Sequence, residues 1–450
     1  MREFLRQNRT FLAALTLAAF ALRLFFLLQF PYIAGDSFTY GDLAKNWMLH
    51  GVFGFSGPAG PVPTLIRLPG YPAFLALVWS VAGVEHYTAV LLAQILLDVG
   101  ACFLVAALTC ELASARAARL AFLIAALCPF TANFAATPLA ETPELFFSAL
   151  ALLCAAKGLR RDAQHPLRWW AGCGATLAAC ILLRPDGGVL LMAIGGLLLL
   201  RWLRGPQRRA AFLAGLVVAV VSLAPLAPWT LRNWRVFHVI QPLVPRHANA
   251  PGEFVPLGFE RWLRTWVVDY SSTEEVYWSD EPVSVDLLPP RAFDSDAQRL
   301  RTQQLLSQFA PENIPPAIDA QFAELAEERI HRAPLRYYLF LPAARVADMW
   351  LRPRTELLGL DTHWWDYESD LEASAISIAL GLLNLALVTA AVWGALRGRV
   401  RHLGMLVSWL LLRSALLATL PTPEPRYTLE CFPVLFLLAA ANAGVRREPA

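Results

Sequence analysis

Residues 11–42 read FLAALTLAAFALRLFFLLQFPYIAGDSFTYGD, and this stretch decides the class of fold. From Phe11 to Leu28 it is almost wholly apolar and about as long as a helix that crosses a bilayer core. An acidic, aromatic segment follows directly, and Asp36 is its first carboxylate. The apolar run is longer than the hydrophobic part of a typical signal peptide, and no A-x-A cleavage site follows it. We therefore expect an uncleaved membrane helix that leads into a polar outer loop.

The composition of the 450 residues extends this expectation to the whole chain. Hydrophobic residues make up 57% of the sequence and charged residues 16%, whereas soluble domains carry roughly 25% charged residues. The apolar residues come in blocks of about 20, the length that spans a membrane. The sequence therefore predicts an all-α polytopic membrane protein with about ten transmembrane helices. The predicted spans are 11–29, 86–110, 117–131, 138–156, 169–183, 187–203, 210–229, 372–396, 403–420 and 427–444.

Basic residues are distributed unevenly between the predicted connections. The segments expected inside are 1–10, 111–119, 157–168, 201–209, 397–402 and 445–450, and they hold 18 lysines and arginines but four acids. Cytoplasmic loops carry such an excess, so we expect both termini in the cytoplasm and the protein in the inner (plasma) membrane. A shorter apolar stretch, Tyr71 to Val84, is expected to form an interfacial or re-entrant helix, because counting it as a span would break this pattern.

The topology divides the chain into three parts. They are an N-terminal transmembrane module (1–229) with a first outer loop at 31–85, a large extracytoplasmic loop region (230–371), and three C-terminal spans (372–450). Residues 230–370 hold 14 arginines and 21 acids, and a connection of this length is too long to lack structure. Within it we expect helices at 298–308 and 317–332, an interfacial amphipathic helix at 334–349, and an ordered loop over the active site at 253–290.

Carboxylates and arginines gather at the predicted outer ends of the helices. Arginine forks match the geometry of phosphate, and a carboxylate can take the proton of a hydroxyl group, so such a set suits a reaction on a lipid phosphate. The alternative is that short outer loops are polar merely because they face water. The candidates are Asp36, Asp42, Glu141, Glu144, Arg184, Asp186, Arg232, Glu424 and Arg426.

Individual positions differ in what they predict. Asp36 is expected to cap the short helix that follows it, a role compatible with catalysis, and Asp42 falls on a different face of that helix. Arg23 and Asp98 lie at comparable depth in neighbouring spans, and since buried charges are usually paired or functional, we expect a structural ion pair. Arg413 also lies in a predicted span, and instead of a purely structural role it has the alternative of reaching toward a phosphate.

Several classes of protein are excluded by missing motifs. The sequence has no GxxxxGK[ST] loop, no HExxH and no GxSxG, which argues against a P-loop ATPase, this class of zinc protease and an α/β-hydrolase. The eight histidines have no metal-ligand spacing, and the seven cysteines lie in or beside apolar segments without a CxxC pair. No basic cluster with interleaved aromatics occurs away from the membrane flanks, so nucleic acid is not an expected partner.

With these residues in hand, the chain resembles the membrane glycosyltransferases of the GT-C fold. It is most similar to the superfamily of protein mannosyltransferases and aminoarabinose transferases, which use polyprenyl-phosphate sugars. The matching features are Asp36 with Tyr40, Ala44 and Gly51, then Arg67-Leu-Pro-Gly-Tyr71-Pro-Ala-Phe, Glu141, Leu183-Arg184-Pro185, and Arg426-Tyr427 ahead of Pro433.

The resemblance implies an inverting transfer of a hexose or pentose on the outer face. Asp36 would act as general base on a hydroxyl of a glycan, lipid or protein acceptor, and Glu141 would be the second catalytic acid. The donor phosphate and substrate would be bound by Arg67, Tyr40, Tyr71, Arg184, Asp186, Arg232 and Arg426. A divalent metal ion, with Asp36 and Glu141 as its ligands, is left open, because many relatives have two adjacent acids in this loop whereas Ser37 follows Asp36 here.

Two other functions are compatible with a polytopic chain. A transporter or lipid-linked-sugar flippase would also explain many spans and buried charges, but it predicts a substrate site at the membrane midplane between two related halves. The acids here cluster at one face, and no internal repeat is visible. A GT-C shell without activity, acting as a scaffold, is the second alternative.

Overall fold

The computed structural model describes residues 2–33, 35–160, 162, 164–279, 283–309, 314–366 and 370–444. Nearly all regular structure in these ranges is helical, as the sequence predicts. The described strands are β1 (Gly54–Phe55) and β2 (Val62–Pro63), which pair antiparallel with Gly54 opposite Pro63. The terminal segment 445–450, which the charge pattern assigns to the inner side, lies outside the described residues.

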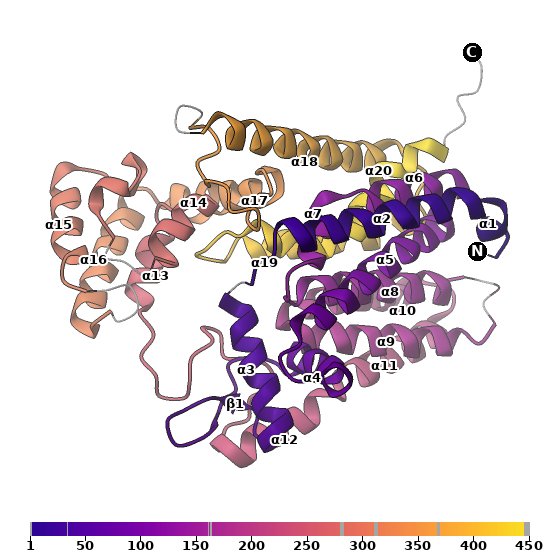
Figure 1. The fold of residues 1–450 in the computed structure, drawn as a ribbon, viewed down its shortest axis with the longest axis horizontal. Coiled ribbons are helices and arrows are strands. Elements are labelled where there is room, and N and C mark those ends of the chain that lie inside the picture. Colours follow the sequence, from indigo (N-terminus) through magenta and orange to yellow (C-terminus); the bar gives the residue numbers. More distant parts are fainter. Residues whose placement is uncertain are drawn as a thin grey trace. The chain divides into compact units, whose positions relative to one another are not determined.

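The chain forms two compact units. Unit 1 comprises residues 1–251, 386–410 and 429–450, and unit 2 comprises residues 252–385 and 411–428. The helices within the first 251 residues are α1 (Arg2–Gln7), α2 (Arg9–Gln29), α3 (Gly35–His50), α4 (Gly70–Ala82), α5 (Tyr87–Leu112), α6 (Ala115–Ala126), α7 (Pro129–Ala135), α8 (Glu141–Gly158), α9 (Pro166–Leu183), η1 (Pro185–Gly187), α10 (Gly188–Arg204), α11 (Arg208–Leu223) and α12 (Leu226–Phe237). Within unit 1, α8, α9 and α11 run side by side (Figure 1).

The remaining helices begin at residue 257. They are α13 (Leu257–Leu263), α14 (Tyr270–Ser272), η2 (Thr273–Tyr277), η3 (Val285–Leu287), η4 (Pro290–Ala292), α15 (Asp296–Leu306), α16 (Pro316–Arg332), η5 (Arg336–Phe340), α17 (Leu341–Leu351), α18 (Leu371–Arg397), α19 (Leu403–Leu417), η6 (Pro425–Cys431), α20 (Phe432–Ala440) and η7 (Ala441–Gly444). The unit boundaries fall inside α18, α19 and η6. The three-part division drawn from the sequence is one of topology, and it stays a prediction.

Six described helices are long and apolar enough to cross a membrane, or seven if one bent pair counts as a single span. The six are Arg9–Gln29, Tyr87–Leu112, Pro166–Leu183, Pro185–Arg204, Arg208–Phe237 and Leu371–Arg397. The stretch expected to be interfacial is the short helix α4, and the segment 427–444 is divided into η6, α20 and η7. Pro433 contributes to this division because it lacks an N–H and restricts the residue before it. The count of ten spans therefore stays a prediction.

The bent pair is α6 and α7, which meet at 53° across Leu127 and Cys128. Pro129 opens α7 and has no N–H to continue the hydrogen bonds of α6. The Ala125 carbonyl keeps a bond of 3.4 Å from the Cys128 N–H, but the carbonyls at the end of α6 lack their regular helical donors in an apolar environment, where an unpaired polar group is costly.

The Arg23 side chain, which is 0% exposed, supplies the missing partners. Its Nη2 donates to Ala125 O at 3.2 Å, and its Nη1 donates to Ala126 O and to Ala19 O. Its Nε donates to Asp98 Oδ2 on α5 at 2.8 Å. The predicted ion pair of Arg23 and Asp98 is thus confirmed, and the guanidinium also caps a broken helix.

Unit 2 has its own apolar core. Phe259, Trp262 and Trp266 from α13 and the turn after it pack against Phe322 of α16, and all four side chains are buried. The two helices predicted at 298–308 and 317–332 are confirmed as α15 and α16. We expected the segment 253–290 to be a loop, but it contains α13, α14, η2 and η3, and η4 begins at its last residue. Its aromatic residues recur at helical spacing and face this core, which favours helical structure.

Arg413 is also buried in unit 2. Its Nε and Nη2 donate to the carbonyl oxygen of Tyr427 at 3.0 and 2.8 Å. The guanidinium thus bonds the 3₁₀ turn of η6, and the alternative that it reaches toward a phosphate stays a prediction.

Exchanging the charges of Arg23 and Asp98 should not restore stability. In R23D/D98R the carboxylate at position 23 cannot donate to the Ala125 and Ala126 carbonyls, and each unpaired buried group costs roughly 1–3 kcal/mol. We expect the double variant to unfold in detergent at a temperature no higher than R23A, and R23K, which keeps donors, to unfold at an intermediate one. The exposed pair Lys45–Glu85 provides the control, because K45E/E85K should change stability by less than about 1 kcal/mol. Wild-type stability in R23D/D98R would contradict the capping role.

Candidate active site

Asp36 lies in the first turn of α3, two residues beyond the N-cap position that we expected for it. Its Oδ1 accepts a hydrogen bond from Arg67 Nη2 at 3.2 Å, and each of the two side chains is 28% exposed. A carboxylate is favoured in a first helical turn, where free N–H groups point toward it. The pair is therefore held in place but is open to a ligand.

Asp42, one and a half turns further along α3, has a structural task. It accepts hydrogen bonds from the Ser56 N–H at 2.7 Å and from the Ser56 hydroxyl at 2.5 Å. Asn46 Nδ2 donates to the same carboxylate and to the carbonyl of Gly54. These bonds fasten the β1–β2 hairpin to α3.

A second acid–arginine group surrounds Arg184, the residue that ends α9. Its Nη1 donates to Glu141 Oε1 at 3.0 Å, and its Nε and Nη2 donate to the two oxygens of Asp186 at 3.2 Å each. Its Nε also lies 3.5 Å from Glu144 Oε2. Three acids from α8 and η1 thus converge on one guanidinium, whose side chain is 18% exposed.

Gly70 allows the two groups to lie in one region. A Cβ atom at this position would lie 2.4 Å from the carbonyl of Leu182 and 2.5 Å from the Leu183 nitrogen. The start of α4, directly after Arg67, therefore packs backbone to backbone on the last turn of α9, directly before Arg184. This contact explains why the Arg-Leu-Pro-Gly-Tyr motif requires glycine.

Tyr71, Gln94 and the turn before α8 form a buried hydrogen-bonded chain. Tyr71 Oη donates to Gln94 Oε1 at 2.6 Å, and Gln94 Nε2 donates to Thr137 O at 2.7 Å. All three residues are 0% exposed. The chain fixes the turn that leads to Glu141. Sequence reasoning missed Gln94, although an amide within the apolar run of α5 was a signal.

Tyr40 lies close to both acid–arginine groups. Its ring stacks edge to face on Tyr71, with 5.0 Å between the ring centroids. Burial, together with the carboxylates of Asp36 and Glu141, raises the pKa of Tyr40 to about 12, while Arg67 and Arg184 act in the opposite direction. All four groups are therefore close enough to act on one hydroxyl, which stays protonated at neutral pH and can donate a hydrogen bond.

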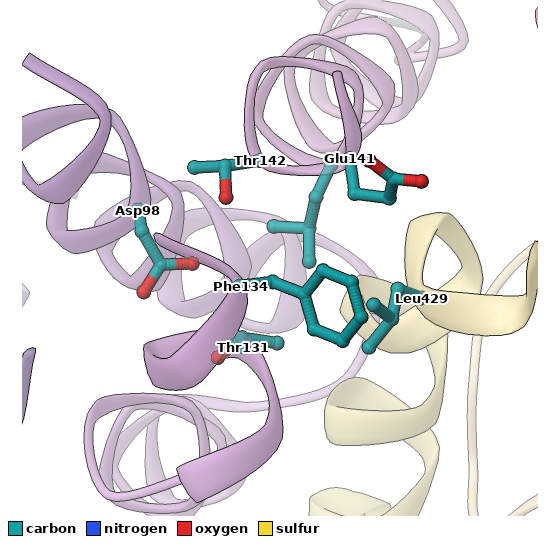
Figure 2. Close-up of a pocket in the computed structure, with 7 residues that line it drawn as sticks. Asp98, Thr131, Phe134, Glu141, Thr142 and Leu429 are labelled. Atoms are coloured by element: carbon teal, nitrogen blue, oxygen red, sulfur yellow. The ribbon is translucent and has the colours of Figure 1, made fainter. Parts of the chain in front are cut away.

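A small hollow separates this region from the Arg23–Asp98 pair. It is lined by Asp98, Thr131, Phe134, Glu141, Thr142, Leu145 and Leu429, and it has no room for a water molecule. Figure 2 shows the Glu141 carboxyl pointing away from Asp98. The hollow is therefore packing space and does not hold a substrate in this conformation.

Two further predicted phosphate ligands bond to groups of their own surroundings. Arg232 on α12 donates to the carbonyls of Phe53 and Thr64 at 2.7 and 2.6 Å, which fastens the first outer loop. Arg426 belongs to unit 2, where its Nε donates to Glu424 Oε2 at 2.6 Å. Their role as phosphate ligands stays a prediction.

The arrangement offers no evident metal site. In the ranges that the structure describes, no three His, Cys, Asp or Glu side chains are placed to hold a metal ion. The Asp36 and Glu141 carboxylates each face an arginine instead. The residues present thus do not fit a bound metal, and we derive no step through one.

Part of the chain is similar in sequence to one protein family, and its fold is similar to that of several solved structures. Residues 62–229, less than half of the chain, match the family model of dolichyl-phosphate-mannose-protein mannosyltransferase. This range begins in β2 and ends in α12, so it includes Arg67, Tyr71, Glu141 and Arg184. No curated protein sequence matches the chain.

Solved structures with a similar fold include the oligosaccharyltransferase of Archaeoglobus fulgidus in complex with Zn and sulfate. It has a TM-score of 0.52 and 16% identity over 95% of this chain and 48% of its own. The archaeal oligosaccharyltransferase AglB from Archaeoglobus fulgidus, in complex with an inhibitory peptide and a dolichol-phosphate, has a TM-score of 0.52 and 14% identity over 97% of this chain and 50% of its own. ArnT from Cupriavidus metallidurans bound to undecaprenyl phosphate has a TM-score of 0.44 and 14% identity over 98% and 77%.

The chain thus spans about half the length of the oligosaccharyltransferase. The likeness to the oligosaccharyltransferase structures confirms the predicted fold class, which is that of the GT-C membrane transferases.

Replacing Gly70 by alanine should loosen the site. The added methyl group would meet the backbone of Leu182 and Leu183, which cannot rotate away, and such overpacking costs roughly 1–3 kcal/mol. We expect G70A to lower the unfolding temperature in detergent. G188A is the matched control, because nothing lies within 4 Å of a Cβ atom there. Equal stability of the two variants would contradict the close approach of α4 and α9.

Proposed function

We propose that the protein is an integral membrane glycosyltransferase that moves a sugar from a polyprenyl-phosphate carrier to a hydroxyl group of a glycan, lipid or protein. One observation carries the proposal. Two acid–arginine groups, Asp36 with Arg67 and Glu141 with Arg184, act on the same Tyr40 hydroxyl. A reaction between a phosphate-linked donor and a hydroxyl acceptor needs both cations and a base, and this region supplies both.

Arg67 is the first contact that we assign to the donor phosphate. The side chain of Arg67 is 28% exposed, whereas that of Arg184 is 18% exposed. The Arg67 guanidinium can bind two phosphate oxygens at once. A phosphate that binds Arg67 competes with Asp36 for the same N–H groups. Donor binding would thereby release the Asp36 carboxylate toward the acceptor.

The reaction then proceeds in one displacement. Asp36 takes the proton of the acceptor hydroxyl as its oxygen forms a bond to the anomeric carbon of the sugar. The bond between that carbon and the phosphate oxygen breaks, and its electron pair stays on the polyprenyl phosphate. The leaving phosphate gains one negative charge, which Arg67 stabilises. Attack opposite the leaving group inverts the anomeric carbon.

Glu141 and Arg184 have an orienting role in this proposal. Glu141 is 5% exposed and bonds Arg184 at 3.0 Å, so it is poorly placed to meet an acceptor itself. Together with Asp186 it holds the guanidinium near Tyr40. Tyr40, protonated at neutral pH, is available to donate to a phosphate or sugar oxygen.

The distribution of basic residues predicts the side of the membrane on which the reaction takes place. The basic inner segments would place both termini in the cytoplasm of an inner membrane, and the outer loop with Asp36 and Arg67 on the periplasmic or extracytoplasmic side. Long exposed apolar faces, including Leu17, Leu28 and Leu96, suit contact with lipid, from which a polyprenyl chain can enter.

Binding of undecaprenyl phosphate tests the exchange at Arg67. We expect R67A to weaken binding in detergent by about tenfold or more and R67K by less, because lysine keeps the charge but loses the fork. D36N should tighten binding, since it removes the competing carboxylate. The measurement is intrinsic tryptophan fluorescence against ligand concentration. Weaker binding in D36N than in the wild type would contradict the exchange.

Sugar transfer tests Asp36 as the base. D36N should lower the rate of transfer from a labelled polyprenyl-phosphate sugar by about 10²–10⁴-fold, the usual contribution of a general base. D42N is the matched control on the same helix, because the amide oxygen can still accept from Ser56. An unchanged rate in D36N would rule out its role. A flippase would move the labelled lipid between leaflets in vesicles without consuming it.

A further inference from the structure

Two buried glutamates, Glu144 and Glu430, take no part in the proposed reaction. Glu144 is 2% exposed and Glu430 is 4% exposed. Their carboxyl groups lie close enough to share a hydrogen bond, and Glu144 Oε1 and Glu430 Oε2 are both buried without a donor. Glu144 comes from the first turn of α8 and Glu430 from η6, where the Ser148 hydroxyl also donates to the Glu430 carbonyl at 3.2 Å. The pair joins segments that are far apart in the sequence.

This contact requires a proton. An ionised carboxylate has acceptor oxygens and no donor, so two ionised carboxylates cannot hydrogen-bond. Glu144 Oε1 is buried without a hydrogen-bond donor. Two like charges in contact inside a protein cannot both persist. One shared proton removes the repulsion and provides the missing donor.

Arg184 is a cation that faces Glu144, and it already contacts Glu141 and Asp186. Cys180 on α9 is a further titratable group close to both glutamates. Asp98 on the neighbouring α5 is paired with Arg23. Acids around Arg184 thus outnumber its charge even when the pair keeps its proton.

We propose that Glu144 and Glu430 share one proton and act as positioning residues for Arg184. Glu144 approaches the Nε side of the guanidinium at 3.5 Å, while Glu141 and Asp186 bond its Nη1 and Nη2 atoms. The shared proton keeps one further negative charge away from Arg184, so an anionic donor is repelled less than it would be with both glutamates ionised. This last point rests on the proposed function, whereas the shared proton does not.

Infrared spectroscopy tests the shared proton directly. A protonated carboxyl group has a C=O stretching band that a carboxylate lacks. In the purified full-length protein at neutral pH, we expect this band to be weaker in E144Q and in E430Q than in the wild type. E85Q, which changes an exposed acid paired with Lys45, should leave the band unchanged. A band that is the same in the wild type and both single variants would overturn the proposal.

The single glutamine variants should stay folded. An amide N–H replaces the shared proton, so the hydrogen bond and the total charge of the pair are both kept. E144L, which removes the carboxyl group that faces Glu430, should unfold at a lower temperature than E144Q. This rescue by glutamine distinguishes the hydrogen-bonded pair from simple filling of space. Equal stability of E144L and E144Q would contradict it.

The pH dependence of undecaprenyl phosphate binding tests the positioning of Arg184. In the wild type, loss of the shared proton at high pH adds a negative charge near Arg184 and should weaken binding by about tenfold. E144Q and E430Q carry a fixed amide proton, so this decrease should be absent from both. If both variants keep the wild-type decrease, the pair does not position Arg184. If no variant binds the lipid while the infrared band behaves as expected, the proposed function and the positioning role fail, and the shared proton stands.

Discussion

Unit 1 depends on the way in which one arginine satisfies a broken helix in apolar surroundings. The chain breaks between α6 and α7 at Pro129, and Arg23 donates to the carbonyl groups exposed there. Without water nearby, these carbonyls have few other partners. Asp98 balances the charge that this cap brings in. The ion pair therefore makes possible a bend of 53°, which a continuous helix would not have.

The bend has consequences along the chain as far as the candidate active site. It turns α7 so that the carbonyls of Ala135 and Thr137 face Gln94 on α5. Gln94 in turn accepts a hydrogen bond from Tyr71, whose ring stacks on Tyr40. The residues after Thr137 lead directly into α8, and Glu141 is its first residue. A structural charge in the apolar part of unit 1 thus sets the geometry of a site near the ends of α3 and α8.

The sequence predicted those features that depend on composition and local spacing. Apolar blocks predicted most of the long helices, and the matched depth of Arg23 and Asp98 predicted their pairing. The break at Leu127 and Cys128 was missed because the apolar pattern continues through it and Pro129 is compatible with the start of a helix. The contact of Glu144 with Glu430 joins positions almost 300 residues apart, and no local pattern specifies such a partner.

The two acid–arginine groups are suited to different tasks by their exposure. Asp36 and Arg67 are each 28% exposed, so water and a ligand can replace their contact at little cost, as is usual for pairs near a surface. Arg184 and Glu141 are 18% and 6% exposed, and breaking a contact there would leave a buried charge without compensation. A base must change partners during a reaction, whereas a residue that orients a substrate must not. The greater exposure of Asp36 therefore favours it over Glu141 as the group that meets the acceptor, even though both are acids in the same region.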